Sequence, residues 1–239
     1  MAKQSRHPRK SKFFALSVKD MARKAALYSL IIFLATSVGL CALLRWLPVP
    51  TSAFMIYRHV EDLMASDPLK PISYSWVNAK KISSHAFSAV IAAEDQRFFQ
   101  HAGFDVQSIQ SSIGAYMDGG KLRGASTISQ QVAKNLFLIP SKSFFRKGLE
   151  AWFTLLLELM WSKERILLVY LNIAEFGDHI FGIEAASQHY FSIPAQQINR
   201  LQAALLAATL PNPIRLKATQ PSPYVLKRQH WILLQMKNQ

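Results

Sequence analysis

Residues 25–44 form a run of 20 amino acids without a charged side chain, AALYSLIIFLATSVGLCALL. A helix needs about 20 apolar residues to cross the ~30 Å hydrocarbon core of a bilayer. We therefore predict a transmembrane helix over residues 25–47, with Trp46 at one membrane interface. The alternative is a cleaved signal peptide, which is disfavoured because the run is long and no A-x-A-like cleavage site follows it.

The charges on either side of this run predict its orientation. Residues 1–24 hold eight Lys and Arg against one acid, a net charge of +7 that is half of the chain's +14. Because basic segments stay on the cytoplasmic side, we expect 1–24 to be a cytoplasmic tail and 48–239 to lie outside. The exported part carries 19 basic and 13 acidic residues, so an anionic substrate or lipid headgroup suits it better than nucleic acid does.

Beyond the span, the spacing of apolar residues is mostly helical. We expect a proline-containing connector over 48–80 and one folded domain over 81–239, without an internal disulfide because Cys41 is the only cysteine. The periodicity predicts helices over 84–94, 127–138, 143–161, 163–174, 182–191, 195–209 and 224–237, with Ser126 and Ser143 as N-caps. The stretch AWFTLLLELMW is expected to be the central buried helix of a mainly α domain.

Glu94 continues the apolar face of the first of these helices. It lies four positions after Val90 and three after Ile91, so the three side chains share one side. A carboxylate there is costly unless it is paired or used, and burial raises a carboxyl pKa toward the range of a general acid or base. The structural interpretation is a buried ion pair of Glu94 with Arg97 or His101, and the spacing alone leaves both open.

A second polar cluster opens the predicted helix that follows the glycine-rich segment 119–124. Thr127, Gln131 and Lys134 recur at i, i+4 and i+7, so they share one face. The free N–H groups of a helix N-terminus favour an anion, and amides with an ammonium suit a sugar and a phosphate. A capped, solvated surface helix explains the same spacing.

A third cluster places cations around a carboxylate. Arg146 and Lys147 precede Glu150 by four and three positions, and Lys142 lies shortly before them. One interpretation is an ion pair on the surface of a helix. The other is a carboxylate held ionised by cations that also bind phosphate.

Taken in order, these clusters resemble the motifs of the family-51 glycosyltransferases, the peptidoglycan polymerases. Five motifs occur in the family's order. They are E-D-x-x-F-x-x-H-x-G from Glu94, G-x-S-T-I-[ST]-Q-Q-x-x-K-N from Gly124, R-K-x-x-E from Arg146, K-x-x-I-L-x-x-Y-L-N from Lys163 and A-x-L-P-x-P from Ala208. The resemblance covers about 80–215 and is closest to the monofunctional, membrane-anchored members of Gram-negative bacteria. One departure is Ala125, where the second motif usually has glycine.

The resemblance implies a mainly α fold: a lysozyme-like, bilobal glycosyltransferase domain behind one N-terminal transmembrane helix. It implies the substrate lipid II, a disaccharide-pentapeptide on undecaprenyl pyrophosphate, together with a growing lipid-linked glycan. The 4-hydroxyl of lipid II attacks C1 of the glycan's lipid-linked end sugar. The pyrophosphate leaves and a β-1,4 bond forms with inversion.

The resemblance also implies the roles of the site residues. Glu94 matches the general base, and Glu150 matches a second essential carboxylate near the leaving pyrophosphate. The implied substrate-binding residues are Ser126, Thr127, Gln130, Gln131, Lys134, Asn135, Lys142, Arg146 and Lys147. Family members commonly respond to Mg²⁺ or Mn²⁺, so a divalent cation is a candidate cofactor, although the sequence shows no ligand cluster for it.

The same resemblance implies a single-pass protein of the Gram-negative inner membrane, with its N-terminus in the cytoplasm and its catalytic domain in the periplasm. Cell-division proteins and penicillin-binding proteins are candidate partners, and nucleic acid is not. No S-x-x-K motif occurs, so we expect no transpeptidase. Two alternatives are a lysozyme-like enzyme that cleaves glycan, which needs no phosphate-binding cluster, and an inactive membrane-tethered scaffold, which needs neither glutamate.

Overall fold

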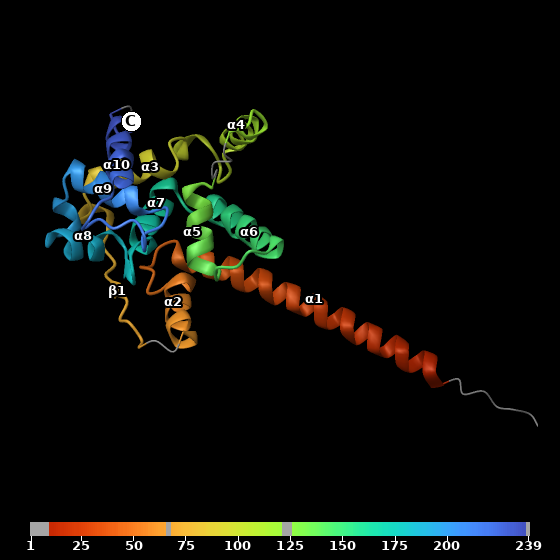
Figure 1. Ribbon diagram of the computed structural model, residues 1–239. Coiled ribbons are helices and arrows are strands. Elements are labelled where there is room, and N and C mark those ends of the chain that lie inside the picture. Colours follow the sequence, from red (N-terminus) through yellow and green to blue (C-terminus); the bar gives the residue numbers. More distant parts are fainter. Residues whose placement is uncertain (1–9, 66–67, 121–125, 238–239) are drawn as a thin grey trace, which may run out of the picture. The chain divides into compact units, whose positions relative to one another are not determined.

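The computed structural model describes residues 10–65, 68–120 and 126–237, with side chains described from Val18 onward (Figure 1). The chain forms two compact units, Met1–Leu43 and Leu44–Gln239. Helix α1 (Lys10–Leu44) is continuous over 35 residues, and its segment Val18–Leu44 is long and apolar enough to cross a membrane. Its large apolar side chains, such as Leu30 and Ile32, are exposed. The predicted N-terminal apolar helix is therefore present and fits membrane anchoring, although it begins earlier, within the basic tail.

The second unit is mainly helical, as predicted. Its α helices are α2 (Ala53–Met64), α3 (Ser84–Glu94), α4 (Val106–Met117), α5 (Ile128–Phe137), α6 (Phe144–Met160), α7 (Lys163–Ile173), α8 (Ile183–Phe191), α9 (Arg200–Thr209) and α10 (Pro223–Gln235). Short 3₁₀ helices cover Ala79–Lys81, Phe98–Gln100 and Ala195–Gln197. Strands β1 (Ser73–Tyr74), β2 (Glu175–Gly177) and β3 (Ile180–Phe181) form a small sheet in the order β1-β3-β2.

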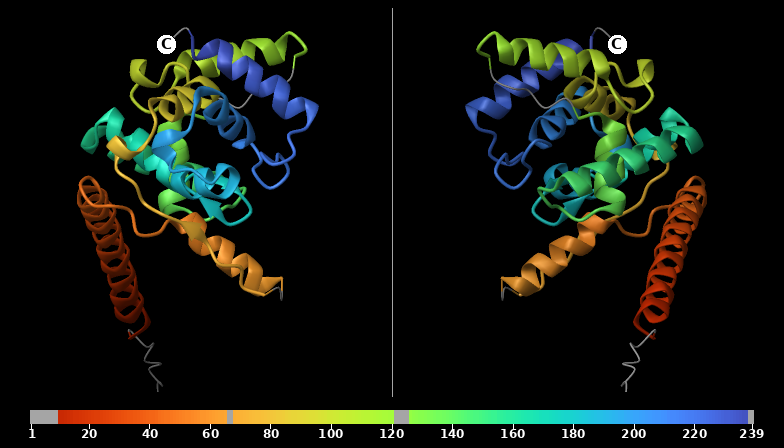
Figure 2. Two further views of the ribbon diagram at one scale, coloured as in Figure 1. Left: turned by 90° about the vertical axis from the view of Figure 1, so that its left-hand side faces the viewer. Right: turned by 90° about the vertical axis from the view of Figure 1, so that its right-hand side faces the viewer.

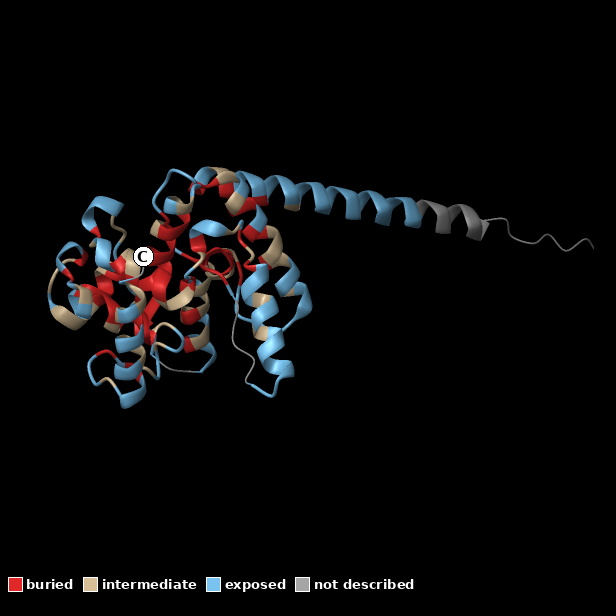
Figure 3. Ribbon diagram, turned by 90° about the horizontal axis from the view of Figure 1, so that it is seen from above, coloured by how far each residue is buried: buried red, intermediate tan, exposed pale blue. Residues whose placement is uncertain are grey.

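Helix α7, and not α6, is the most buried helix of this unit. From Ile166 to Ile173 every side chain of α7 except Leu168 is buried. The expectation that α6 is the central buried helix is wrong, because Leu155 and Leu159 on its outer face are exposed. The core gathers where α5 packs against both α6 and α7 and where α3 packs against α9. Figure 3 shows the buried residues in the interior of the second unit, whereas the long α1 is mostly exposed.

The predicted connector over 48–80 is largely built into the fold. Strand β1 pairs in parallel with β3, with Ser73 opposite Ile180 and Tyr74 opposite Phe181. Helix α2 buries the guanidinium group of Arg58, whose Nε lies 3.2 Å from Oε1 of Glu175 on β2. The buried charges on α2 interrupt the apolar periodicity, which explains why the sequence pattern does not predict this helix.

Two further differences concern helix boundaries. Helix α4 is not predicted by the apolar pattern, because none of its side chains is buried. The predicted helix over 195–209 divides into a 3₁₀ turn and α9, since Asn199 and Gln202 form a capping box that starts a new helix. Figure 2 shows α10, the last helix, lying against α9, and α10 also contacts α3.

Candidate active site

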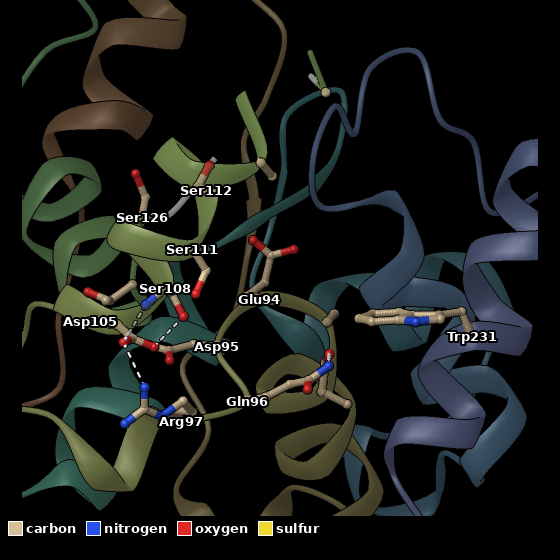
Figure 4. Close-up of a pocket in the computed structure, with 15 residues that line it drawn as sticks. Glu94, Asp95, Gln96, Arg97, Asp105, Ser108, Ser111, Ser112, Ser126 and Trp231 are labelled. Carbon is tan, nitrogen blue, oxygen red and sulfur yellow. Dashed lines mark hydrogen bonds and ion pairs between the residues drawn. The ribbon is translucent and has the colours of Figure 1, made fainter. Parts of the chain in front are cut away.

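Two cavities adjoin in the second unit. The larger, of about 720 Å³, is lined by Glu94 at the end of α3, by the Ser108, Ser111 and Ser112 face of α4, and by Trp231 of α10 (Figure 4). The smaller, of about 190 Å³, is lined by Ser126, Gln130, Gln131, Lys134, Arg146, Lys147 and Glu150. Because Ser126 lines both cavities, the predicted clusters meet at one place in the structure.

Glu94 is held by two partners from different helices. The amide Nε2 of Gln131 on α5 donates a hydrogen bond of 2.9 Å to Oε2 of Glu94, and Nη2 of Arg228 on α10 lies 3.1 Å from Oε1. The side chain of Glu94 is 14% exposed, and this burial raises its pKa above the ordinary value, while Gln131 and Arg228 act to lower it. Such a carboxyl, at the wall of a cavity, is suited to proton transfer.

The structural interpretation of Glu94 named the wrong partners. His101 Nε2 lies 3.0 Å from the carboxylate of Asp95, and Arg97 Nη1 lies 3.3 Å from Oδ1 of Asp105. His101 and Arg97 therefore contact the carboxylates of Asp95 and Asp105, and the partners of Glu94 are Gln131 and Arg228.

Asp95 ties the end of α3 to the start of α5. Its Oδ2 accepts a hydrogen bond of 3.0 Å from the amide of Ile128, the first residue of α5. The amide of Gly103 donates to Nδ1 of His101 over 3.2 Å, so the Nε2 atom of that ring carries the proton that faces Asp95. The first motif and the start of the second are thus one hydrogen-bonded unit, and this unit fixes where Glu94 lies.

The N-cap of α5 is Thr127, one residue after the predicted Ser126. The amide of Gln130 donates to Oγ1 of Thr127, and the amide of Thr127 donates to Oε1 of Gln130, which completes a capping box. Thr127 Oγ1 also donates a hydrogen bond of 2.6 Å to the carbonyl of Gly103. Both capping side chains are buried, whereas Ser126 is exposed and remains able to contact a ligand. Gly124 and Ala125 lie outside the described residues.

Gly103 explains the glycine at the end of the first motif. Its φ angle is +85°, a conformation that side chains rarely adopt, and an added Cβ atom would lie 2.8 Å from Cγ2 of Thr154 and 2.9 Å from Cγ of Glu158. Glycine is therefore required for the loop that carries His101 to pack closely on α6.

Glu150 forms the centre of the cationic cluster. Its side chain is buried on α6, Nη1 of Arg146 lies 2.7 Å from its Oε2, and Nζ of Lys147 contacts its Oε1. Ser143 caps the start of this helix, as predicted, and the carbonyl of Ser141 accepts a further hydrogen bond of 2.6 Å from Nε of Arg146. Both oxygens of Glu150 are thus used to hold the two cations in place.

The ammonium group of Lys134 interacts electrostatically with both Glu94 and Glu150. Burial lowers the pKa of its ammonium group, and the nearby charges of Arg146 and Lys147 lower it further. The carboxylates of Glu150 and Glu94 both oppose this by favouring the charged form. A partly desolvated ammonium between two acids is well placed to meet an anionic group of a ligand.

The structure does not bring every predicted binding residue to the cavities. Seven of the predicted binding residues line one cavity or both: Ser126, Thr127, Gln130, Gln131, Lys134, Arg146 and Lys147. Within the described part of the chain, Asn135 is half-buried and Lys142 is exposed, and neither side chain belongs to the lining of these two cavities.

Sequence reasoning missed the contribution of α4 and α10. Ser108, Ser111 and Ser112 line one wall of the larger cavity, and Figure 4 shows Trp231 across the open space from them, beyond Glu94. Arg228 and Trp231 are three positions apart, which places them on one face of α10. That spacing is the only signal in the sequence, and it is too common to identify a site.

The described residues do not fit a resident metal ion. Across 18–65, 68–120 and 126–237, no three His, Cys, Asp or Glu side chains come together to hold one. The oxygens of Glu150 and of Glu94 are both engaged by donor or cationic groups. Acidic ligands that are already paired with cations are poorly suited to a divalent cation.

Comparisons with known proteins identify the family of this chain. The family described as Transglycosylase matches residues 63–237. A biosynthetic peptidoglycan transglycosylase of Pasteurella multocida is 47% identical over 98% of this chain and 94% of its own length. A relative with the same description from Pseudomonas entomophila is 49% identical over 87% of this chain and 88% of its own length. Another, from Ectopseudomonas mendocina, is 54% identical over 81% of this chain and 79% of its own length. The chain therefore belongs to the transglycosylase family.

Proposed function

We propose that this chain polymerises the glycan of peptidoglycan, by transferring a lipid-pyrophosphate-linked glycan onto the 4-hydroxyl of lipid II. One observation carries this proposal. A partly buried carboxyl with a raised pKa, Glu94, lines a cavity that adjoins the cationic cluster of Lys134, Arg146 and Lys147. A base beside a cluster of cations suits an alcohol that displaces a pyrophosphate, because the base takes a proton where the cations receive negative charge.

In the proposed reaction, Glu94 is the general base. Its carboxylate takes the proton of the acceptor 4-hydroxyl as the oxygen forms a bond to C1 of the donor sugar. The bond from C1 to the pyrophosphate oxygen breaks, and its electron pair leaves with the pyrophosphate toward Lys134, Arg146 and Lys147. Displacement from the opposite face inverts the anomeric centre and yields the β-1,4 bond.

Glu150 acts through the cations that it holds. Because its buried oxygens engage Arg146 and Lys147, their charges are fixed toward the smaller cavity and do not have to reorganise when the pyrophosphate leaves. The carboxylates of Glu94 and Glu150 belong to different, adjoining cavities. In the proposed inverting reaction the donor and acceptor sugars lie between the two glutamates, one toward each cavity.

A divalent cation is not used in this mechanism. Since both oxygens of Glu94 and of Glu150 already engage other groups, a divalent cation that stimulates activity would act through the substrate pyrophosphate.

The membrane setting follows from the substrate. We propose that α1 spans the inner membrane with the basic tail in the cytoplasm and the second unit in the periplasm. Phe144 and Phe145 at the start of α6 are 99% and 78% exposed, next to the cationic cluster, which suits contact with a bilayer that presents the lipid-linked substrate. A reporter fused after Gln239 is expected to be active only if it works in the periplasm; an active cytoplasmic reporter there contradicts the orientation.

The S-x-x-K motif of a transpeptidase does not occur in residues 1–239. We therefore propose that the product strands pass to penicillin-binding proteins or other cell-division proteins in the same membrane.

The decisive experiment incubates the detergent-solubilised full chain with labelled lipid II. We expect a glycan polymer that lysozyme degrades. Glu94→Gln removes the base and is expected to lower the rate about 10²-fold or more while lipid II binding persists. Shortening of added glycan favours the hydrolase, and binding without polymer favours the scaffold; either result contradicts the proposal.

A further inference from the structure

Helix α10 lies beyond the segment that carries the recognised motifs, yet it contacts the proposed base directly. Nη2 of Arg228 lies 3.1 Å from Oε1 of Glu94 and also donates to the carbonyl of Ala93 over 3.2 Å. One nitrogen thus engages both the carboxylate of Glu94 and the backbone of the residue before it. The arginine comes from the opposite end of the domain sequence, 134 positions away.

We propose that Arg228 is a positioning residue that keeps the carboxylate of Glu94 ionised and fixed at the wall of the larger cavity, ready to accept the proton of the acceptor hydroxyl. This inference rests on the proposed function. It deepens that function by assigning to α10 a role in preparing the base.

The contacts of Arg228 favour this role over that of a structural tie. Its Nε atom is buried and has no hydrogen-bond partner among the residues that the structure describes. An unpaired buried N–H costs free energy, so a guanidinium group placed only to join two helices is expected to use this atom as well. The side chain instead directs Nη2 to the carboxylate of Glu94, and the same atom contacts the carbonyl of Ala93.

The remaining groups around Glu94 do not replace this charge. Gln131 on α5 contributes a neutral amide, and the hydroxyl of Tyr170 on α7 donates to Oε1 of that amide over 3.3 Å, which keeps the NH₂ group turned toward Glu94. Asp95, the next residue, is an acid that faces Ile128 and His101 instead. Lys134 favours ionisation but is shared with Glu150. Arg228 is therefore the cation in direct contact with the base.

Loss of this cation has a specific consequence for the pH dependence. Burial already raises the pKa of Glu94, and Arg228 opposes that effect. Without the arginine, a smaller fraction of Glu94 is ionised at acidic and neutral pH, but the fraction recovers as the pH rises. The rate should therefore fall on the acidic side of the profile and return toward the wild-type rate on the alkaline side.

The test compares initial polymerisation rates of the full chain and of Arg228→Gln from acidic to alkaline pH. We expect a loss of about tenfold on the acidic side, the scale of one hydrogen bond to a charged group, and recovery at alkaline pH. Arg228→Lys keeps a cation, so the acidic limb, the part of the pH–rate profile where the rate falls with falling pH, is expected to stay near its wild-type position. Its rate is expected to be lower, because the contact with the carbonyl of Ala93 is lost.

Arg200→Gln is the matched control. Nη2 of Arg200 on α9 donates to the carbonyl of Leu233 over 2.5 Å, so its removal loosens α10 without touching Glu94. We expect the acidic limb of Arg200→Gln to stay in place. An equal rate loss at every pH in Arg228→Gln, or the same shift in Arg200→Gln, overturns the inference. Absence of polymer from the wild-type chain at every pH instead overturns the proposed function.

Discussion

The carboxylate of Asp95 accepts a hydrogen bond of 3.0 Å from the amide of Ile128, and this contact joins the helix that ends at Glu94 to the helix that presents Gln131 and Lys134. A carboxylate at a helix N-terminus satisfies a free amide and interacts favourably with the helix dipole. The same carboxylate contacts His101 at 3.0 Å. One buried acid, Asp95, therefore fixes the position of Glu94 relative to Gln131 and Lys134.

Replacing Asp95 by alanine is expected to destabilise the folded protein and, at the same time, to loosen the contact between α3 and α5 that positions Glu94. The change leaves the amide of Ile128 and the ring of His101 without their partner, at a cost of about 1–3 kcal/mol. Thermal unfolding in detergent measures this as a lower Tm. Asp95→Asn keeps an oxygen for Ile128 and should lose less. Equal Tm values for the alanine variant and the wild type contradict the bracing role.

Glu94 is expected to lower stability at neutral pH. A buried carboxyl whose pKa is raised in the folded state binds its proton more tightly when folded than when unfolded. Its ionisation therefore costs stability as the pH rises from the ordinary value of 4.5 through the higher folded value, and no such cost exists below 4.5.

Glu94→Gln should consequently be more stable than the wild type at neutral pH, by about 2–4 °C in Tm for each 1 kcal/mol removed in a domain of this size. The difference should close as the pH falls below 4.5. Thermal melts at several pH values measure it. A variant that is less stable than the wild type at neutral pH shows that the contacts with Gln131 and Arg228 outweigh burial.

The sequence predicted which polar side chains share a helix face, because its motifs are local. Glu94, the Gln131 and Lys134 face, and the Arg146, Lys147 and Glu150 cluster each lie within a few positions on one helix, where spacing determines which side chains share a face. Their meeting around Ser126 depends on packing between helices, and only the family resemblance anticipated it.

The parts that escaped prediction depend on long-range contacts or weak patterns. Arg228 reaches Glu94 from 134 positions away, and a single arginine on the final helix carries no local signal. Helix α4 buries none of its side chains, so it lacks the apolar stripe by which a helix is recognised. Helix α6 is apolar on both faces, and composition alone does not show that Leu155 and Leu159 face outward.

Glu150→Gln is expected to lower the polymerisation rate at least about tenfold, on the scale of one lost charged hydrogen bond. The change removes the acid that Arg146 and Lys147 both contact, which leaves them and Lys134 as mutually repelling cations. Steady-state rates with lipid II measure the loss. Glu164→Gln, at an exposed acid in the first turn of α7, is the control and should retain activity. A Glu150→Gln rate within a few-fold of the wild type means that Glu150 merely neutralises the two cations.

Trp231 is expected to contribute to acceptor binding and not to proton transfer. Trp231 is 41% exposed and lines the larger cavity, where Figure 4 shows its indole across the open space from the α4 serines. A flat apolar surface opposite hydroxyl groups suits a sugar, which has an apolar face and a polar edge.

Trp231→Ala should therefore raise the KM for lipid II several-fold with little change in kcat, because loss of about 1 kcal/mol of apolar contact weakens binding about fivefold. Trp231→Phe keeps a ring and should recover most of the affinity. Tyr224→Ala is the control, since Tyr224 is an exposed aromatic residue of the same helix outside the lining of the two described cavities. A lower kcat at unchanged KM in Trp231→Ala places the residue among the groups that prepare the base, beside Arg228, and rules out the binding role.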